Sequence, residues 1–207
     1  YMKGVDLFIA PSEFMRQIMI RGGWPSERIV TLHNSLHPED FEPNYEPGDY
    51  YAYIGRLSSE KGVMTLLRAA EIAKGIRVVI VGDGLMMDPM RRYSEEHKLE
   101  NVEFRGRMKL EEVKGILSAS RALILPSEWY ENCPMTVLEA FAMGKPAIGA
   151  RIGGIPELIT PGVNGLLFES GNAEQLAQSM IDLSENAEEA KRMGINGRKT
   201  LETRFSS

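Results

Sequence analysis

From Tyr51 onward, short apolar runs rich in β-branched residues alternate with longer stretches in which apolar residues recur every three or four positions. The short runs predict strands, and the longer ones predict amphipathic helices. The predicted strands are Tyr51–Ile54, Ile76–Val81, Val102–Phe104, Ala122–Leu125 and Ala147–Ile148, and the predicted helices are Lys61–Ala73, Met87–His97, Leu110–Ser118 and Met135–Met143. Alternation of this kind predicts an α/β fold with a doubly wound, mainly parallel sheet.

The two ends of the chain follow other patterns. The first fifty residues predict a strand at 6–10, a helix at 13–21 and a short strand at 29–32, followed by an acidic, proline-rich surface connection. After Phe168, two charged amphipathic helices are predicted at 173–183 and 187–205. The chain starts close to a strand without an initial methionine and stops where a helical pattern ends, so we expect it to be part of a longer one.

The charge balance limits the classes of partner. With 24 basic and 29 acidic residues the net charge is −5, so the basic stripe of a general nucleic-acid binder is absent. The one cysteine, Cys133, excludes an internal disulfide and favours a reducing, cytoplasmic location. No apolar run approaches the roughly 18 to 20 residues of a spanning helix, which leaves contact with a membrane surface open.

The loop after the first strand of the alternating region, YIGRLSSEKG, carries two cations. Gly55 permits a tight turn, and Ser58 or Ser59 is predicted to cap the next helix. Lys61 would then occupy the first helical turn, where the helix dipole disfavours a positive charge. Arg56 and Lys61 would converge on one edge of the sheet, where a diphosphate is a natural ligand; the alternative is that both are solvated loop charges.

A second loop and helix, PSEWYENCPMTVLEAFAMGKP, carries two carboxylates. Pro134 and Gly144 mark the start and end of the helix. Glu139 lies inside it among apolar residues, where a carboxylate is costly unless a polar group meets it, and a ribose diol would do so. Glu131 precedes the helix, whose first amides, at Met135 and Thr136, form an anion site. The alternative is a pair of ordinary surface acids.

The order of several segments resembles a known family. YIGRLSSEKG, VGDG, VEFRGRM, the two glutamates seven residues apart, GGIPELI and NGLLF follow one another over nearly the whole chain. This order is similar to that of the C-terminal, donor-binding domain of family 4 of the retaining glycosyltransferases, which have the GT-B fold. The resemblance implies that residues 1–50 are the tail of an N-terminal domain and a linker, and that 51–207 form a Rossmann-like domain that binds a nucleotide sugar.

The resemblance also implies roles for single residues. Arg56 and Lys61 would bind the donor diphosphate, Glu131 the donor sugar and Glu139 the ribose, while the base would meet the backbone near Arg107 and Met108. The predicted donor-binding residues are Gly55, Arg56, Lys61, Arg107, Met108, Glu131, Met135, Thr136 and Glu139, of which Glu131, Arg56 and Lys61 are also expected to be catalytic. Here Asn-Cys-Pro replaces the Gly-Phe-Gly that often follows the first glutamate, and Asn34-Ser35 replaces a common Asn-Gly.

The implied reaction transfers a sugar from a UDP-, GDP- or ADP-linked donor to a glycan, lipid or small-molecule acceptor, with retention of configuration. It needs no further cofactor, and the sequence has no Asp-x-Asp cluster for a divalent metal. The acceptor is expected on the preceding domain, so we expect the chain alone to bind donor weakly and transfer nothing. Bond breaking leaves charge on the diphosphate, which cations and helix amides would stabilise.

Two other functions stay open at this point. The VGDG segment suggests a nicotinamide-dependent oxidoreductase, with Glu103 as its ribose acid, but Met87 stands where the third glycine belongs, and a plain turn is favoured. A non-catalytic nucleotide-binding module is the other alternative. The histidines lack metal spacing, Cys133 is expected to pack beside the site, and Gly153 and Gly154 are expected to form a turn beneath the donor. Trp24 and Trp129 are expected to pack, although Trp129 lies close enough to Glu131 to leave a sugar-platform role open.

Overall fold

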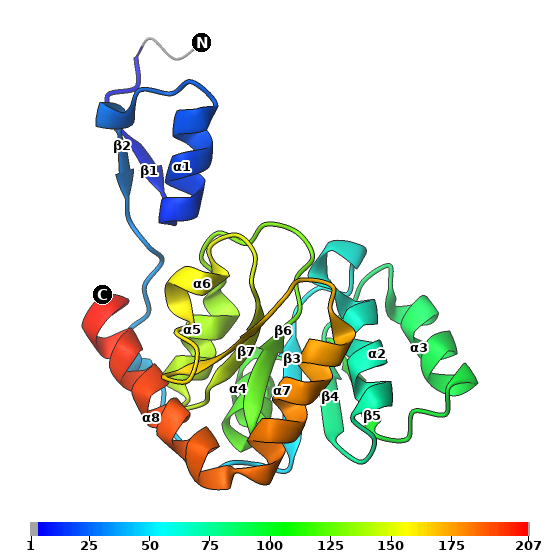
Figure 1. Cartoon of the computed structure of the whole chain (residues 1–207). Coiled ribbons are helices and arrows are strands. Elements are labelled where there is room, and N and C mark those ends of the chain that lie inside the picture. The colour runs from blue at the N-terminus through cyan, green and yellow to red at the C-terminus, as the bar shows by residue number, and fades with distance from the viewer. Residues whose placement is uncertain (1–3, 207) are drawn as a thin grey trace.

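Six parallel strands form the central sheet of the computed structural model, which describes residues 4–206 (Figure 1). Their order is β5-β4-β3-β6-β7-β8. The strands are β3 (Tyr50–Ile54), β4 (Arg77–Val81), β5 (Val102–Gly106), β6 (Ala122–Leu125), β7 (Ala147–Ala150) and β8 (Gly165–Phe168). The predicted doubly wound parallel sheet is confirmed.

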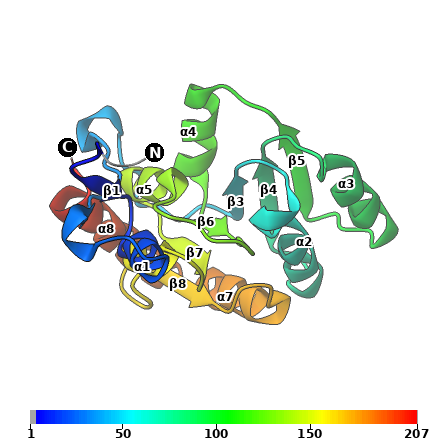
Figure 2. The ribbon, with the colours of Figure 1, turned by 90° about the horizontal axis from the view of Figure 1, so that it is seen from above.

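Helices cover both faces of this sheet, as the view from above shows (Figure 2). The helices are α2 (Val63–Ile72), α3 (Met87–Glu96), α4 (Leu110–Ala119), α5 (Met135–Ala142), α6 (Ile155–Leu158), α7 (Ala173–Glu185) and α8 (Ala187–Arg204). α2 and α7 lie on one face, α4 and α5 on the other, and α8 packs on α5. Strands β6 and β7 are fully buried apolar runs, as expected where helices cover both faces.

The chain reverses its direction of winding between β3 and β6. From β3 it adds β4 and then β5 on one side, and it then returns to add β6, β7 and β8 on the other. The ladder between β3 and β6 pairs Tyr51 with Ala122 and Ala52 with Leu123 but continues no further, so the carboxyl ends of these two strands separate. Ligands of open α/β sheets bind outside the strands' carboxyl ends at such a reversal.

A small unit precedes the sheet. Strands β1 (Phe8–Ala10) and β2 (Ile29–Thr31) pair in parallel, with helix α1 (Glu13–Arg21) between them in the chain. One short 3₁₀ turn (Ser26–Arg28) precedes β2, and another (Pro38–Asp40) follows it. Figure 1 shows this unit standing above the sheet and joined to it by a single extended segment.

The connecting segment is fastened by cations of the main body. The Arg198 guanidinium donates hydrogen bonds to the backbone oxygens of Pro38 and Phe41, and the buried Lys145 ammonium donates to that of Glu46. Burial lowers the pKa of Lys145 to about 8. The predicted surface connection therefore runs along the main body.

Most predicted elements are found within two residues of their expected ends, and three expectations need correction. Helix α2 starts at Val63 rather than Lys61, because a 3₁₀ turn (Ser59–Lys61) and Gly62, in the left-handed region at φ 65°, precede it. The Ser58 hydroxyl does not cap this helix but donates to Glu60. Strand β8 and the short helix α6 were not predicted, since each has only four residues.

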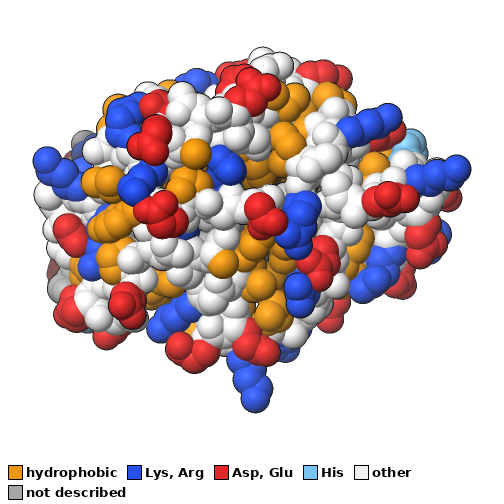
Figure 3. Space-filling model, turned by 90° about the horizontal axis from the view of Figure 1, so that it is seen from below, with side chains coloured by type: hydrophobic (Ala, Val, Ile, Leu, Met, Phe, Trp, Pro, Cys, Tyr) orange, Lys and Arg blue, Asp and Glu red, His pale blue; other side chains and the backbone are white. Residues whose placement is uncertain are grey.

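The surface seen from below carries mixed charge (Figure 3). Basic and acidic side chains are interspersed over this face, which lies away from the carboxyl ends of the strands. An alternating pattern does not form the field of one sign that steers nucleic acid toward a protein.

Candidate functional site

Two adjoining hollows lie where β3, β4 and β6 end. One, of about 330 Å³, has Arg107 and Met108 in its wall, and the other, of about 280 Å³, has Lys61 and Glu131. Ile54, Gly55 and Arg56 belong to both and form the boundary between them. The predicted donor-binding residues that line one or both hollows are Gly55, Arg56, Lys61, Arg107, Met108, Glu131, Met135 and Thr136.

Arg56 is held at this boundary through its backbone. The buried Tyr53 hydroxyl donates a 2.7 Å hydrogen bond to the backbone oxygen of Arg56. Burial, followed by the charge of Glu131, raises the pKa of Tyr53, so it stays a neutral donor. The Arg56 side chain is exposed and forms no ion pair with the residues that the structure describes. It is therefore available to an anion in either hollow.

Lys61 and Glu131 form an ion pair across the second hollow. The Lys61 Nζ lies 2.5 Å from Glu131 Oε1, and the two side chains are 29% and 16% exposed. Lys61 follows β3 and Glu131 follows β6, so the strand reversal brings together two residues 70 positions apart in the chain. A half-buried pair facing a cavity presents both a cation for phosphate oxygens and an acceptor for hydroxyl groups.

Two glycines fix the loop that carries Glu131. The Gly154 N–H donates a 2.6 Å hydrogen bond to the backbone oxygen of Glu131, and Gly153 adopts φ 60° beneath it. A Cβ at Gly153 would lie 2.3 Å from that oxygen, and one at Gly154 would lie 1.8 Å from the backbone oxygen of Asn132. Only glycine fits so close an approach. The expected turn is confirmed, and it supports the backbone of Glu131 and Asn132.

The start of helix α5 adds polar backbone. Met135 and Thr136 occupy its first turn, where N–H groups have no acceptor within the helix. Both residues line the Lys61 hollow. Together with the positive end of the helix dipole, they make this edge of the cavity suitable for an anion.

Glu139 lies one turn further along α5 and does not line either hollow. Burial raises the pKa of its carboxyl group, and the charge of Lys114 on α4 opposes part of that rise. Within residues 4–206 no group donates a hydrogen bond to the Glu139 carboxylate, whose oxygens are not fully buried. It is the one predicted donor-binding residue that the two hollows do not reach.

Both glycines of VGDG closely approach the backbone that follows β3, and Gly82 also lines the 330 Å³ hollow. A Cβ at Gly82 would lie 1.8 Å from the backbone oxygen of Gly55, and one at Gly84 would lie 2.3 Å from that of Leu57. These glycines therefore allow the turn after β4 to support the turn after β3. The need for two glycines in this segment is therefore explained by packing, with no dinucleotide required.

Several other expectations can be compared with the structure. Cys133 is buried beside the loop of Glu131, where burial raises the pKa of its thiol, so the expectation of a packing role is confirmed. Trp24 packs edge-on against Phe8, as predicted. The packing expected for Trp129 is wrong, because its side chain is 66% exposed and contacts the ring of Tyr130 in a tilted arrangement; the alternative, a sugar platform, stays a prediction.

Sequence reasoning did not find Ser127, whose buried hydroxyl donates to Glu131. A serine two residues after a strand carries no spacing signal, so only the folded loop identifies it.

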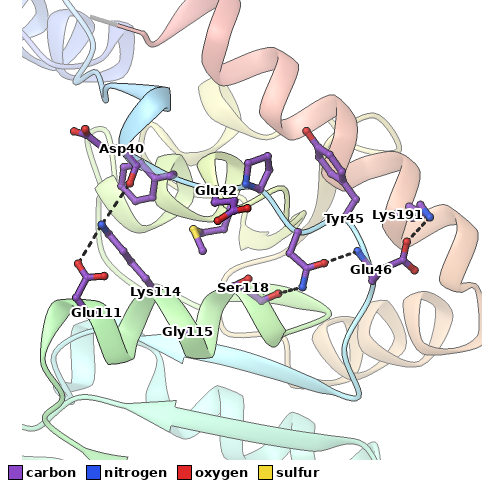
Figure 4. A pocket seen from close by; sticks show the side chains of 13 residues that line it. Asp40, Glu42, Tyr45, Glu46, Glu111, Lys114, Gly115, Ser118 and Lys191 are labelled. Carbon is purple, nitrogen blue, oxygen red and sulfur yellow. Dashed lines mark hydrogen bonds and ion pairs between the residues drawn. The ribbon is translucent and has the colours of Figure 1, made fainter.

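A larger hollow of about 820 Å³ lies away from these residues, between α4, the connecting segment and α8 (Figure 4). Its two lysines are already paired, Lys114 with Glu111 and Lys191 with Glu46. Residues 4–206 contain no cluster of three or more metal-ligating side chains, and none of the described helices is long and apolar enough to cross a membrane.

Residues 39–200 match the family described as Glycosyl transferases group 1. The chain belongs to this family. This match supports the expectation that the chain is the C-terminal domain of a GT-B glycosyltransferase. The narrower expectation, membership of family 4, stays a prediction.

Individual relatives agree with this family. The chain is 30% identical over 181 residues to an uncharacterized glycosyltransferase of Methanocaldococcus jannaschii, a match that covers 86% of the chain and 50% of the relative. It is 34% identical over 145 residues to a GDP-mannose-dependent alpha-mannosyltransferase of Corynebacterium glutamicum, covering 70% of the chain and 32% of the relative. The chain thus spans half or less of the length of these two relatives.

A solved structure shares the fold. The Anabaena protein HepE, crystallised in complex with UDP and glucose, superimposes with a TM-score of 0.89 at 23% identity, covering 97% of this chain and 59% of HepE. At this identity the likeness shows the fold alone, the GT-B Rossmann-like domain.

Proposed function

We propose that this chain binds a nucleoside diphosphate sugar at the carboxyl ends of β3 and β6, and that the full-length protein transfers the sugar to an acceptor. The observation that carries the proposal is the shared position of Arg56. It stands between a hollow suited to a nucleoside and a hollow that contains an ion pair suited to a sugar. The diphosphate joins these two parts of the ligand and would lie against Arg56.

The charges support this placement. Arg56 and Lys61 supply two cations, and the α5 amides at Met135 and Thr136 supply donors on the opposite wall. When the bond between the anomeric carbon and the diphosphate oxygen breaks, negative charge grows on the diphosphate. These groups would stabilise that charge without a metal ion, so we include metal independence in the proposal.

The two glutamates would meet the two sugars. Glu131 faces the hollow beyond the diphosphate and would accept from hydroxyl groups of the transferred sugar. Glu139, partly buried and without a donor among the described residues, would accept from the ribose diol, and the base would contact backbone near Arg107 and Met108. In a same-face reaction the acceptor oxygen bonds to the anomeric carbon on the face from which the diphosphate oxygen leaves, the acceptor proton passes to the departing diphosphate, and the anomeric configuration is retained.

The acceptor surface would come from an N-terminal domain that ends within residues 1–50. The outer face of the β1–β2 pair supports this part of the proposal, because Leu7, Ile9, Val30 and Leu32 are between 41% and 62% exposed there. Parallel strands are normally covered on both faces. A cytoplasmic protein that reaches glycan, lipid or small-molecule acceptors, including acceptors at a membrane face, fits this arrangement.

Calorimetric titration tests the proposal on the 207-residue chain. The ligands are UDP-glucose, GDP-mannose and ADP-glucose, with NAD as the comparison ligand. We expect one or more nucleotide sugars to bind and NAD not to bind. Lys61→Ala and Glu139→Ala should each weaken that binding at least tenfold, whereas Lys74→Ala, which changes an exposed lysine outside both hollows, should not change it. Binding of NAD alone would overturn the proposal.

A further inference from the structure

The side chain of Ser127 is buried beneath the candidate sugar-binding carboxylate. Ser127 is 0% exposed, and its hydroxyl donates a 2.8 Å hydrogen bond to Oε1 of Glu131. The same oxygen accepts a 2.5 Å hydrogen bond from the Lys61 ammonium. Within residues 4–206, Oε2 of Glu131 has no hydrogen-bond partner. Two donors therefore hold one oxygen of the carboxylate and leave the other for a ligand in the hollow.

The backbone on both sides of Ser127 is fixed. The Ser170 hydroxyl donates to the backbone oxygen of Ser127, and the Glu128 N–H donates to the backbone oxygen of Glu60. The backbone oxygen of Pro126 approaches Gly62 so closely that a Cβ there would lie 1.7 Å away. The loop can follow a displaced Glu131 side chain only by breaking these contacts, so the Ser127 hydroxyl is a stationary donor.

The two donors to Glu131 differ in what a ligand does to them. Lys61 faces the hollow, and a diphosphate there would draw its ammonium away from Glu131. Ser127 is buried and does not line either hollow, so a ligand in them has no direct contact with its hydroxyl. When Lys61 turns to phosphate, Ser127 is the contact that keeps the carboxylate in place.

We propose that Ser127 is a positioning residue that aims Glu131 at the donor sugar and thereby favours a nucleotide sugar over the bare nucleoside diphosphate. This inference rests on the proposed donor site. With a sugar present, one of its hydroxyl groups donates to the free Oε2 of Glu131 and replaces part of the interaction that Lys61 provided. A bare diphosphate has no sugar hydroxyl group there, so the interaction with Lys61 is lost without replacement. Without the Ser127 hydroxyl, the carboxylate follows Lys61, and the sugar loses its acceptor.

The ratio of the dissociation constants of the nucleoside diphosphate and its nucleotide sugar tests this role, since a loss of fold stability would weaken the binding of both alike. UDP and UDP-glucose, and GDP and GDP-mannose, are titrated calorimetrically into the 207-residue chain and its variants. Ser127→Ala should weaken binding of the nucleotide sugar about tenfold, as expected for a lost hydrogen bond to a charged group, and change binding of the nucleoside diphosphate less than about twofold. Ser120→Ala is the matched control, because this serine is equally buried but donates to the backbone of Leu117.

The outcomes separate the two proposals. If the unaltered chain binds none of the four ligands, the donor site itself is wrong. If it binds them and Ser127→Ala leaves the ratio unchanged, or weakens both ligands equally, only the role of Ser127 is wrong. Should Ser127→Ala fail to fold, Ser127→Cys keeps the shape of the side chain with a weak donor and is judged by the same ratio.

Discussion

The carboxylate of Glu157 accepts a 2.7 Å hydrogen bond from the backbone N–H of Phe14, although the two residues are 143 positions apart. The same carboxylate accepts from the N–H of Glu13 at 2.8 Å and contacts His33 Nε2 at 3.0 Å. A residue of α6 in the main body thus caps helix α1 of the N-terminal unit. A carboxylate at a helix N-terminus interacts favourably with the helix dipole, so this contact holds the two parts together.

Replacing Glu157 by glutamine should loosen this connection. The amide keeps one acceptor oxygen but loses the charge, so we expect the N–H groups of Glu13 and Phe14 to exchange with solvent about tenfold faster, as measured by NMR hydrogen exchange. Glu174→Gln, at the exposed first turn of α7, is the control. Equal exchange at both amides in the variant and the unaltered chain would contradict the capping role.

Gly154→Ala should disturb the loop of Glu131. Its Cβ would have to occupy space 1.8 Å from the backbone oxygen of Asn132, so the loop or α6 must move. We expect a loss of about 1–3 kcal/mol in the free energy of unfolding in urea, together with weaker binding of whichever nucleotide sugar the chain binds.

Gly115→Ala is the matched control for this substitution. Gly115 lies in α4, and a Cβ there meets nothing within 4 Å. Alanine at this position should stabilise the helix by up to about 1 kcal/mol. A Gly154→Ala variant as stable as the unaltered chain would show that the close approach is not required.

The Glu139 carboxyl group should make stability depend on pH. Burial raises its pKa above the ordinary value of 4.5, so the native chain keeps the proton to higher pH than the unfolded chain does. Above pH 4.5 the native chain therefore binds more protons than the unfolded chain does. As pH rises through this range, the contribution of Glu139 to stability falls. Glu139→Gln removes the ionisation.

Urea unfolding at two pH values measures this effect. We expect Glu139→Gln to be more stable than the unaltered chain at pH 7, by on the order of 1 kcal/mol, and to lose most of that advantage at pH 4. Glu174→Gln, which changes an exposed acid, should show no such difference between the two pH values. An advantage of Glu139→Gln that is the same at both pH values would rule out ionisation of Glu139 as its cause.

The alternation of strands and helices follows from the sequence alone, because buried parallel strands and amphipathic helices have different periods and lengths. The sequence also marked Arg56, which leaves the end of a predicted strand, and Lys61, which breaks the charge rule for a first helical turn, as candidate site residues, whereas Glu131 was expected mainly from the family resemblance. It did not find β8 or α6, whose four residues are too few to show a period.

The contacts between these residues depend on how the strands and helices pack. The strand order places Lys61 against Glu131 and separates the ends of β3 and β6, and no local pattern encodes a contact across 70 positions. The same holds for Ser127 beneath Glu131 and for Glu157 at the start of α1. A side chain's chemistry is fixed by its residue type, but its partners depend on which strands lie side by side, and that is a property of the whole packed sheet.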